Sequence, residues 1–231
     1  GNDLILLGHL PEQLALGRAL NHSVPQATAD RITKARARLP QALPSLDVLG
    51  CAEHRAIAQR IADAAITLVR GALPLRLDPE SRVYVVTPEP RNLTPADTSS
   101  AVTVRLDETI AARHANTRGL VIPFSTRLED LPALLAELES ADVVIVGTIV
   151  AERDPVQAEL VRAIHARGQR LIVVSLRTPY DISAFPMVET YLCAYGIREH
   201  STEAVARALF GELTPTGTLP CAIPNMTSPT V

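Results

Sequence analysis

Short apolar runs alternate with amphipathic stretches over the second half of the chain. The candidate strands are RVYVVTP (82–88), VTVRL (102–106), GLVIPF (119–124), ADVVIVGT (141–148), RLIVVSL (170–176) and ETYLCAY (189–195). Helical spacing of apolar positions predicts helices over 126–140, 154–168 and 201–211. Runs such as VVIVG and LIVVS are apolar on both faces, as parallel strands between two helical layers must be. The pattern therefore predicts a three-layer α/β/α sandwich with a mostly parallel sheet.

The first half of the chain has a different pattern. Residues 1–8, GNDLILLG, have the apolar character of one buried strand without a neighbouring partner strand. Helical spacing follows over 11–20 and 24–39, with Ser23 as the expected N-cap of the second helix. The prolines of 40–50 then predict a linker, and helical spacing resumes over 53–69.

Composition excludes several classes of partner. The 231 residues are 47% apolar but only 3% aromatic, so the core must be aliphatic. A formal net charge of -3 leaves no basic surface typical of nucleic-acid binding. No apolar stretch reaches the ~18 residues of a membrane span, so no membrane partner is expected.

The three cysteines give no sign of a disulfide framework or a zinc site. Cys51, Cys193 and Cys221 are odd in number, far apart and outside any C-x-x-C pattern. We therefore expect a reduced, cytoplasmic chain without a structural metal.

Three loops are the places where function is expected. Ligands of open parallel sheets bind outside the carboxyl ends of the strands, which points to residues 87–95, 147–155 and 175–181. The first of these, TPEPRNLTP, has no glycine and so lacks the residues that normally allow the close backbone approach of a dinucleotide site. No P-loop and no G-x-S-x-G nucleophile turn occurs in the chain.

The loop after the fourth apolar run carries Glu152, Arg153 and Asp154. Asp154 stands directly before Pro155, which is a typical N-cap and first-turn combination. Glu152 has two interpretations: a carboxylic acid directed at a substrate, or a solvated side chain like Arg153.

The loop after the fifth run carries Arg177, Tyr180 and Asp181 in the stretch LIVVSLRTPYD (171–181). Arg177 and Asp181 are four residues apart across a Thr-Pro-Tyr turn. They could pair with each other, pair with a neighbouring domain, or contact a ligand hydroxyl. An exposed pair by itself contributes at most ~1 kcal/mol, so any larger role requires a partner.

The end of the chain resembles a known family. ALFGELTPTGTLPCAIP (208–224) resembles the L-F-G-E-x-x-P-x-G-x-L-P-x-x-I-P sequence near the end of the α/β domain of glycoside hydrolase family 3. Residues 54–75 are similar to the helix that leads from that family's barrel into its second domain. Residues 141–148 and 171–181 look closest to the β-N-acetylhexosaminidase branch, where the strand also runs into Ser-x-Arg-x-Pro-Tyr-Asp.

The resemblance implies a division of the chain into three parts. Residues 1–40 look like the end of a catalytic (β/α) barrel, with its last strand and closing helices. Residues 41–75 then correspond to a linker and connecting helix, and 76–231 to the C-terminal α/β domain. The implied partners are the N-terminal barrel of the same protein and a carbohydrate substrate, with N-acetylglucosamine-containing glycans or cell-wall fragments as the substrate class. No cofactor and no metal is implied.

The resemblance also implies that the main catalytic residues are not in this chain. In this family the nucleophilic Asp lies on a barrel strand, and the hexosaminidase branch takes its acid/base His from a K-H-F-P-G-H-G-like barrel loop. Neither motif occurs in the 231 residues. In the β-glucosidase branch the acid/base Glu comes from the second domain, which is the one route by which Glu152 would be catalytic.

The remaining candidates are implied to be contacts and not catalysts. Arg153, Arg177, Tyr180 and Asp181 are expected to lie at the domain interface or near the sugar. An alternative from another class is a stand-alone, non-catalytic binding or scaffold module.

Overall fold

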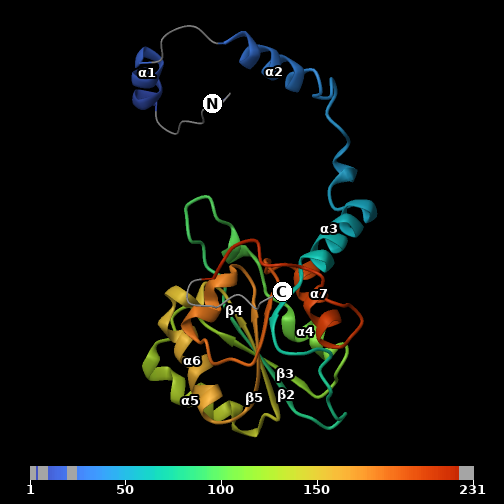
Figure 1. The fold of residues 1–231 in the computed structure, drawn as a ribbon, viewed down its shortest axis with the longest axis vertical. Helices are drawn as coiled ribbons and strands as arrows, with labels where there is room; N and C mark the ends of the chain where they lie inside the picture. The colour runs from blue at the N-terminus through green and yellow to red at the C-terminus, as the bar shows by residue number, and fades with distance from the viewer. Residues whose placement is uncertain (1–3, 5–9, 20–24, 224–231) are drawn as a thin grey trace. The chain divides into compact units, whose positions relative to one another are not determined.

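Most of the apolar runs form the strands of one sheet in the computed structural model, which describes residue 4 and residues 10–19 and 25–223 (Figure 1). The strands are β1 (Thr67–Arg70), β2 (Val83–Pro88), β3 (Thr117–Ile122), β4 (Val143–Thr148), β5 (Arg170–Ser175) and β6 (Thr190–Cys193). Their order in the sheet is β1-β6-β5-β4-β2-β3. Every neighbouring pair is parallel except β1 with β6, which is antiparallel.

Helices cover both faces of this sheet, because the central strands are apolar on both sides. Val83 and Val85 of β2 face one core, whereas Tyr84 and Val86 face the other. The first core is closed by α3 (Ala52–Ala65), α4 (Leu106–Ala111) and α7 (Glu199–Leu209), and the second by α5 (Leu131–Glu137) and α6 (Pro155–Ala166). Figure 1 shows α5 and α6 together on one side of the strands. The predicted three-layer α/β sandwich with a mostly parallel sheet is confirmed.

Residues 1–50 and 51–231 form two separate compact units. The first unit contains α1 (Leu10–Ala19), α2 (Gln26–Arg36) and the short 3-10 turn η1 (Leu46–Val48). Ser23 and all of residues 1–8 except Leu4 lie outside the described residues. The barrel origin of residues 1–40 and the domain limits at 40 and 75 stay predictions. None of the helices in the described part of the chain is long and apolar enough to cross a bilayer.

Short 3-10 turns complete the second unit. They are η2 (Ser99–Ala101), η3 (Leu128–Asp130), η4 (Leu138–Ser140), η5 (Ala151–Arg153) and η6 (Pro179–Ala184). The helix predicted over 126–140 is therefore split into η3, α5 and η4, with Pro132 in the first turn of α5. The helices predicted over 154–168 and 201–211 are present as α6 and α7.

The strand predicted over 102–106 is wrong. Val104 and Leu106 are buried and Arg105 is exposed, so the alternation of a strand is real. However, the place beside β2 is taken by β3, and α4 begins at Leu106. Alternation of apolar and polar residues shows only that one side of the segment is buried. A strand also needs a neighbouring strand with which its backbone forms hydrogen bonds.

The helix predicted over 53–69 is wrong in its last four residues. Helix α3 ends at Ala65, and Thr67–Arg70 form the edge strand β1 against β6. Ile66, Thr67 and Val69 are β-branched, a residue type that favours strands over helices. The preference of these residues for a strand and the free edge of β6 therefore both favour strand formation.

The segment after α7, residues 211–223, folds back onto the sheet and is referred to below as the C-terminal strap. Gly211 ends α7 with a φ of 81°, in the left-handed region that favours glycine. Glu212 then accepts two hydrogen bonds from the Arg113 guanidinium, at 2.7 and 2.9 Å. Ile223, near the other end of the strap, is buried in the second core. The described part of 208–224, the segment that carries the family resemblance, thus holds the end of the chain against the sheet.

Gly217 is the tightest point of the C-terminal strap. Its N–H donates to the carbonyl oxygen of Ile66 at 3.0 Å. A Cβ at this position would lie 2.5 Å from the Ala65 carbonyl oxygen and 2.5 Å from Thr67 Oγ1. Any side chain would therefore push the strap away from the start of β1.

We expect Gly217→Ala to lower the free energy of unfolding of the sheet domain by roughly 1–3 kcal/mol, because a methyl group would overlap backbone that cannot move freely. Urea unfolding followed by far-UV circular dichroism measures this change. The matched control is Gly17→Ala, because a Cβ on Gly17 would meet no atom within 4 Å. Equal unfolding midpoints for the two variants would contradict the packing argument.

Candidate functional site

The order of the strands creates one distinctive position in the sheet. The chain passes from β2 to β3 on one side of β2 and then returns to pair β4 on its other side. The helices that follow β2 and β4, α4 and α6, consequently pack on opposite faces. Such a reversal leaves a crevice outside the carboxyl ends of the two strands, which is where ligands of doubly wound sheets bind.

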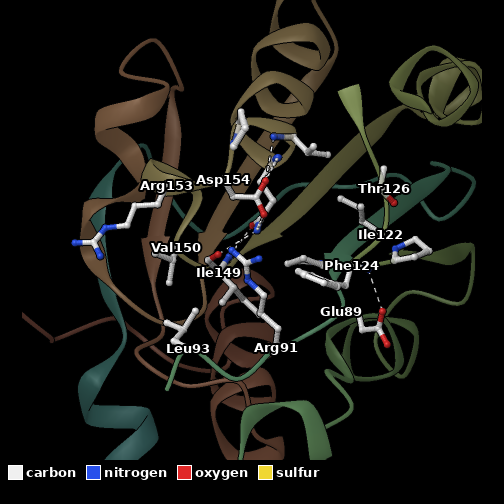
Figure 2. A pocket seen from close by; sticks show the side chains of 15 residues that line it. Glu89, Arg91, Leu93, Ile122, Phe124, Thr126, Ile149, Val150, Arg153 and Asp154 are labelled. Atoms are coloured by element: carbon white, nitrogen blue, oxygen red, sulfur yellow. Dashed lines mark hydrogen bonds between the residues drawn. The ribbon is translucent and has the colours of Figure 1, made fainter. Parts of the chain in front are cut away.

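A cavity of about 270 Å³ occupies this position (Figure 2). It is lined by residues of 88–93, 122–126 and 149–157, and is referred to below as the switch-point crevice. Two of the three loops expected from the sequence, 87–95 and 147–155, contribute to it. The third, 175–181, does not line it.

Interactions across the crevice hold its loops together. The Arg91 guanidinium stacks on the Phe124 ring, with its carbon 4.9 Å from the ring centre. Glu89 Oε2 accepts a hydrogen bond from the Phe124 backbone N–H at 3.0 Å. Figure 2 shows Arg91 beside Phe124 and the Glu89 carboxylate turned toward the far side. The loops after β2 and β3 are therefore joined at two points.

The loop after β4 is held in an unusual conformation. Val150 has a φ of 56°, which for a β-branched residue costs on the order of 1–3 kcal/mol. The Gln157 side chain compensates by accepting from the Ile149 N–H at 2.8 Å and donating to its carbonyl oxygen at 3.0 Å. Asp154 accepts from the N–H groups of Val156 and Gln157, so its predicted role as N-cap of α6 is confirmed.

Arg177 pairs with Asp97 and not with Asp181. Its guanidinium donates to Asp97 Oδ2 at 2.8 Å and to Ser99 Oγ at 3.2 Å. The Leu93 N–H, the Ser99 hydroxyl and the Arg177 guanidinium all donate to Asp97 and hold the pKa of its carboxyl well below the usual range. This contact fixes the long loop after β2.

Asp97 was not identified from the sequence. Its Oδ1 accepts from the N–H of Ser99, two residues further on, at 2.9 Å. Such a turn is common for Asp in loops, so the spacing Asp-x-Ser predicts a local role. Nothing local indicates that Arg177, 80 residues away, supplies the ion pair.

Asp181 lies fully buried at the carboxyl ends of β4 and β5. Its Oδ2 accepts from Thr148 Oγ1 at 2.6 Å, and its Oδ1 accepts from the Ala151 N–H at 2.9 Å. Burial, followed by the adjoining carboxyl of Glu152, raises the pKa of Asp181 to about 8. Asp181 is therefore protonated at neutral pH and links η5 to η6.

Glu152 is drawn inward toward Asp181. Its side chain is only 18% exposed, whereas that of Arg153 is 83% exposed, and the two groups are 3.9 Å apart. Glu152 Oε2 is buried and accepts no hydrogen bond from the described residues. The interpretation of a solvated side chain is right for Arg153 and wrong for Glu152, because the short turn η5 directs the carboxyl under the loop that carries Asp181.

The other sequence-predicted residue, Tyr180, is half-buried beside the C-terminal strap. Hydrogen bonding to Cys221 raises the pKa of its hydroxyl. The structure thus brings Glu152, Tyr180 and Asp181 into one cluster, whereas Arg177 contacts the loop after β2. Arg153 is the one of these five residues that lines the switch-point crevice.

Comparison with known proteins identifies the family. The sequence profile of the Glycosyl hydrolase family 3 C-terminal domain matches residues 69–230. The chain belongs to this family. The resemblance carried by residues 208–224 is confirmed, and so is the expected class of fold. No curated protein sequence matches the chain significantly.

Several solved structures resemble this family 3 chain. A family 3 β-N-acetylglucosaminidase from Paenibacillus sp. str. FPU-7 has 28% identity and a TM-score of 0.71 over 87% of this chain and 38% of that one. A fungal multi-domain family 3 β-N-acetylglucosaminidase has 24% identity and a TM-score of 0.69 over 87% of this chain and 24% of that one. A β-glucosidase from Listeria innocua has 13% identity and a TM-score of 0.59 over 78% of this chain and 28% of that one.

The chain corresponds to only a part of each of these proteins. The last two share the fold at low identity. The chain spans less than two-fifths of the length of each of the three proteins.

The pKa of Asp181 predicts a pH dependence of stability. Asp181 keeps its proton in the folded chain up to about pH 8, whereas an unfolded Asp loses it near ~4. The folded chain therefore binds more protons in this window, and the free energy of unfolding falls as pH rises from about 4 to about 8. We expect Asp181→Asn to flatten this slope, which reaches at most ~1.4 kcal/mol per pH unit for one group. Urea unfolding at pH 5, 6, 7 and 8 measures it.

The control for this experiment is Asp142→Asn. Asp142 is half-exposed, and hydrogen bonds from Arg82 lower the pKa of its carboxyl to about 2. Its contribution to stability is complete above the unfolded pKa of ~4 and is lost only as pH falls further. The slope between pH 5 and 8 should therefore be that of the parent chain. A parent-like slope in Asp181→Asn would show that Asp181 is not the titrating group.

Proposed function

We propose that this chain is the C-terminal α/β domain of a family 3 glycosidase of the β-N-acetylglucosaminidase type. It packs on an N-terminal (β/α) barrel, and the carboxyl edge of its sheet borders the active site in that barrel. The proposal rests above all on the 28% identity and TM-score of 0.71 with the Paenibacillus β-N-acetylglucosaminidase. The Ser-Leu-Arg-Thr-Pro-Tyr-Asp stretch at 175–181, which resembles that branch, supports it.

Exposed apolar side chains support the presence of a packing partner. In the first unit, four leucines between residues 39 and 49 are between 68% and 93% exposed. In the second unit, Ile61 of α3 is 65% exposed, while Ala62 on the same helix is buried against the sheet. Clusters of exposed apolar side chains mark interaction surfaces. The family resemblance of 54–75 to the helix that leaves the barrel makes the barrel the partner that fits.

The catalytic groups of this proposed enzyme lie on the barrel. A retaining glycosidase needs a nucleophile and an acid/base about 5 Å apart across the scissile bond. The chain contains neither the nucleophile strand nor the His-containing loop motif of the hexosaminidase branch. The substrate class, glycans or cell-wall fragments that contain N-acetylglucosamine, follows from the same branch. Arg177, Tyr180 and Asp181 then contribute by shaping the loops that face the barrel.

We expect the purified 231-residue chain to show no hydrolysis of aryl β-N-acetylglucosaminides, because loss of the nucleophile costs several powers of ten in rate. Release of the aryl group measured by absorbance tests this. The full-length protein, with its barrel, is the positive control and should hydrolyse the same substrate. Turnover by the chain alone, or inactivity of the full-length protein on this substrate, would contradict the proposal.

A second candidate function assigns the acid/base role to Glu152, as in the β-glucosidase branch. The observation in its favour is that the Glu152 carboxyl is largely buried and lies beside the carboxyl of Asp181. The observation against it is that the carboxyl points under the loop that carries Asp181 and does not line the crevice.

Glu152→Gln in the full-length protein separates the two candidates. Under the main proposal, kcat/KM for aryl glycosides with poor leaving groups falls less than about tenfold, because Glu152 only supports a loop. A true acid/base would lose roughly 10²–10⁴-fold on such substrates and much less on those with good leaving groups. Glu159→Gln on the exposed surface of α6 is the matched control and should leave kcat/KM unchanged.

A further inference from the structure

We propose that the switch-point crevice binds a small organic acid, with its carboxylate on the Arg91 guanidinium and its apolar part against the walls of the crevice. This inference goes beyond the glycosidase function proposed above. It lies at the reversal of strand order between β2 and β4, and it is a defined cavity of about 270 Å³.

Arg91 supplies the recognition group. Its guanidinium is held 4.9 Å from the centre of the Phe124 ring, and it makes no hydrogen bond or ion pair with any residue that the structure describes. Figure 2 shows the guanidinium beside Ile149 in the middle of the crevice. Stacking fixes the plane of the guanidinium and leaves its donors free at the edge, which suits the two oxygens of a carboxylate.

The two acidic residues that line the crevice do not neutralise Arg91. The Glu89 carboxylate accepts from the Phe124 backbone and is turned to the far side (Figure 2). The Asp154 carboxylate is occupied by the first turn of α6 and by the Gln157 amide, at 2.9 Å from Nε2. The Arg91 guanidinium is therefore left without an anion, and the two carboxylates of the crevice repel a dianion more strongly than a monoanion. This charge pattern favours a single carboxylate over a phosphate dianion.

The walls of the crevice fit the apolar part of such a ligand. Ile122 and Ile149 contribute the ends of β3 and the chain just after β4, and Pro155 contributes the first turn of α6. Val150, in its left-handed conformation, completes this wall. The lining also includes polar side chains such as Thr126 and Gln157, so the crevice combines an apolar wall with polar groups, as small-molecule sites do. The volume accommodates a six-membered ring with one carboxylate.

The test uses benzoate as the probe and benzamide as its neutral isostere. We expect isothermal titration of the 231-residue chain at low salt to show benzoate binding at least tenfold more tightly than benzamide. Arg91→Gln should abolish this preference, and Phe124→Leu should weaken benzoate binding several-fold by releasing the guanidinium. Far-UV circular dichroism of each variant confirms that the fold is retained.

Arg118→Gln is the matched control, because the Arg118 guanidinium also lies over an aromatic ring, 5.7 Å from the centre of Tyr84, but does not line the crevice. Its affinity for benzoate should equal that of the parent. Equal binding of benzoate and benzamide, unchanged binding by Arg91→Gln, or displacement of benzoate by inorganic phosphate at equal concentration would each overturn the proposal. None of these outcomes depends on glycosidase activity, so failure here leaves the proposed function intact.

Discussion

The burial of both faces of the central strands is the constraint on which the rest of this structure depends. β2, β4 and β5 carry aliphatic side chains on both sides, so each parallel connection must place a helix on one face or the other. With β3 on one side of β2 and β4 on the other, the helices that follow β2 and β4 are forced onto opposite faces. The crevice between their loops is a direct consequence of this arrangement.

Two carboxyl groups, the partly buried Asp97 and the fully buried Asp181, organise the loops at the same edge of the sheet. Asp97 accepts hydrogen bonds from the Leu93 N–H, the Ser99 hydroxyl and the Arg177 guanidinium, and so fixes the loop after β2. Asp181 is protonated at neutral pH and joins the ends of β4 and β5 through Thr148 and Ala151. One carboxyl is kept charged by donors and the other is kept neutral by burial, yet both serve to position loops. Both carboxyl groups thus hold loops at the carboxyl edge of the sheet in fixed positions.

The sequence that carries the family resemblance has a structural role in its described part. Gly211 ends α7, Glu212 binds Arg113, and Gly217 lets the C-terminal strap approach the backbone at the start of β1. β1 is the antiparallel edge of the sheet, so the strap is held at the point where α3 ends and β1 begins. The positions of Gly211, Glu212 and Gly217 in this motif are therefore explained by packing.

The sequence by itself determined the fold class, most of the strands and the N-cap at Asp154, because these depend on periodicity and on contacts within a few residues. The fixed spacing of residues 208–224 also determined the family. Only the tertiary structure decided that residues 102–106 lack a strand partner and that Thr67–Arg70 form an edge strand. It also decided that Arg177 pairs with Asp97, and that Glu152 turns toward Asp181. These features depend on residues from about 30 to about 126 positions apart. No local pattern specifies which distant segment will pair with a strand or which distant group will pair with a given charge.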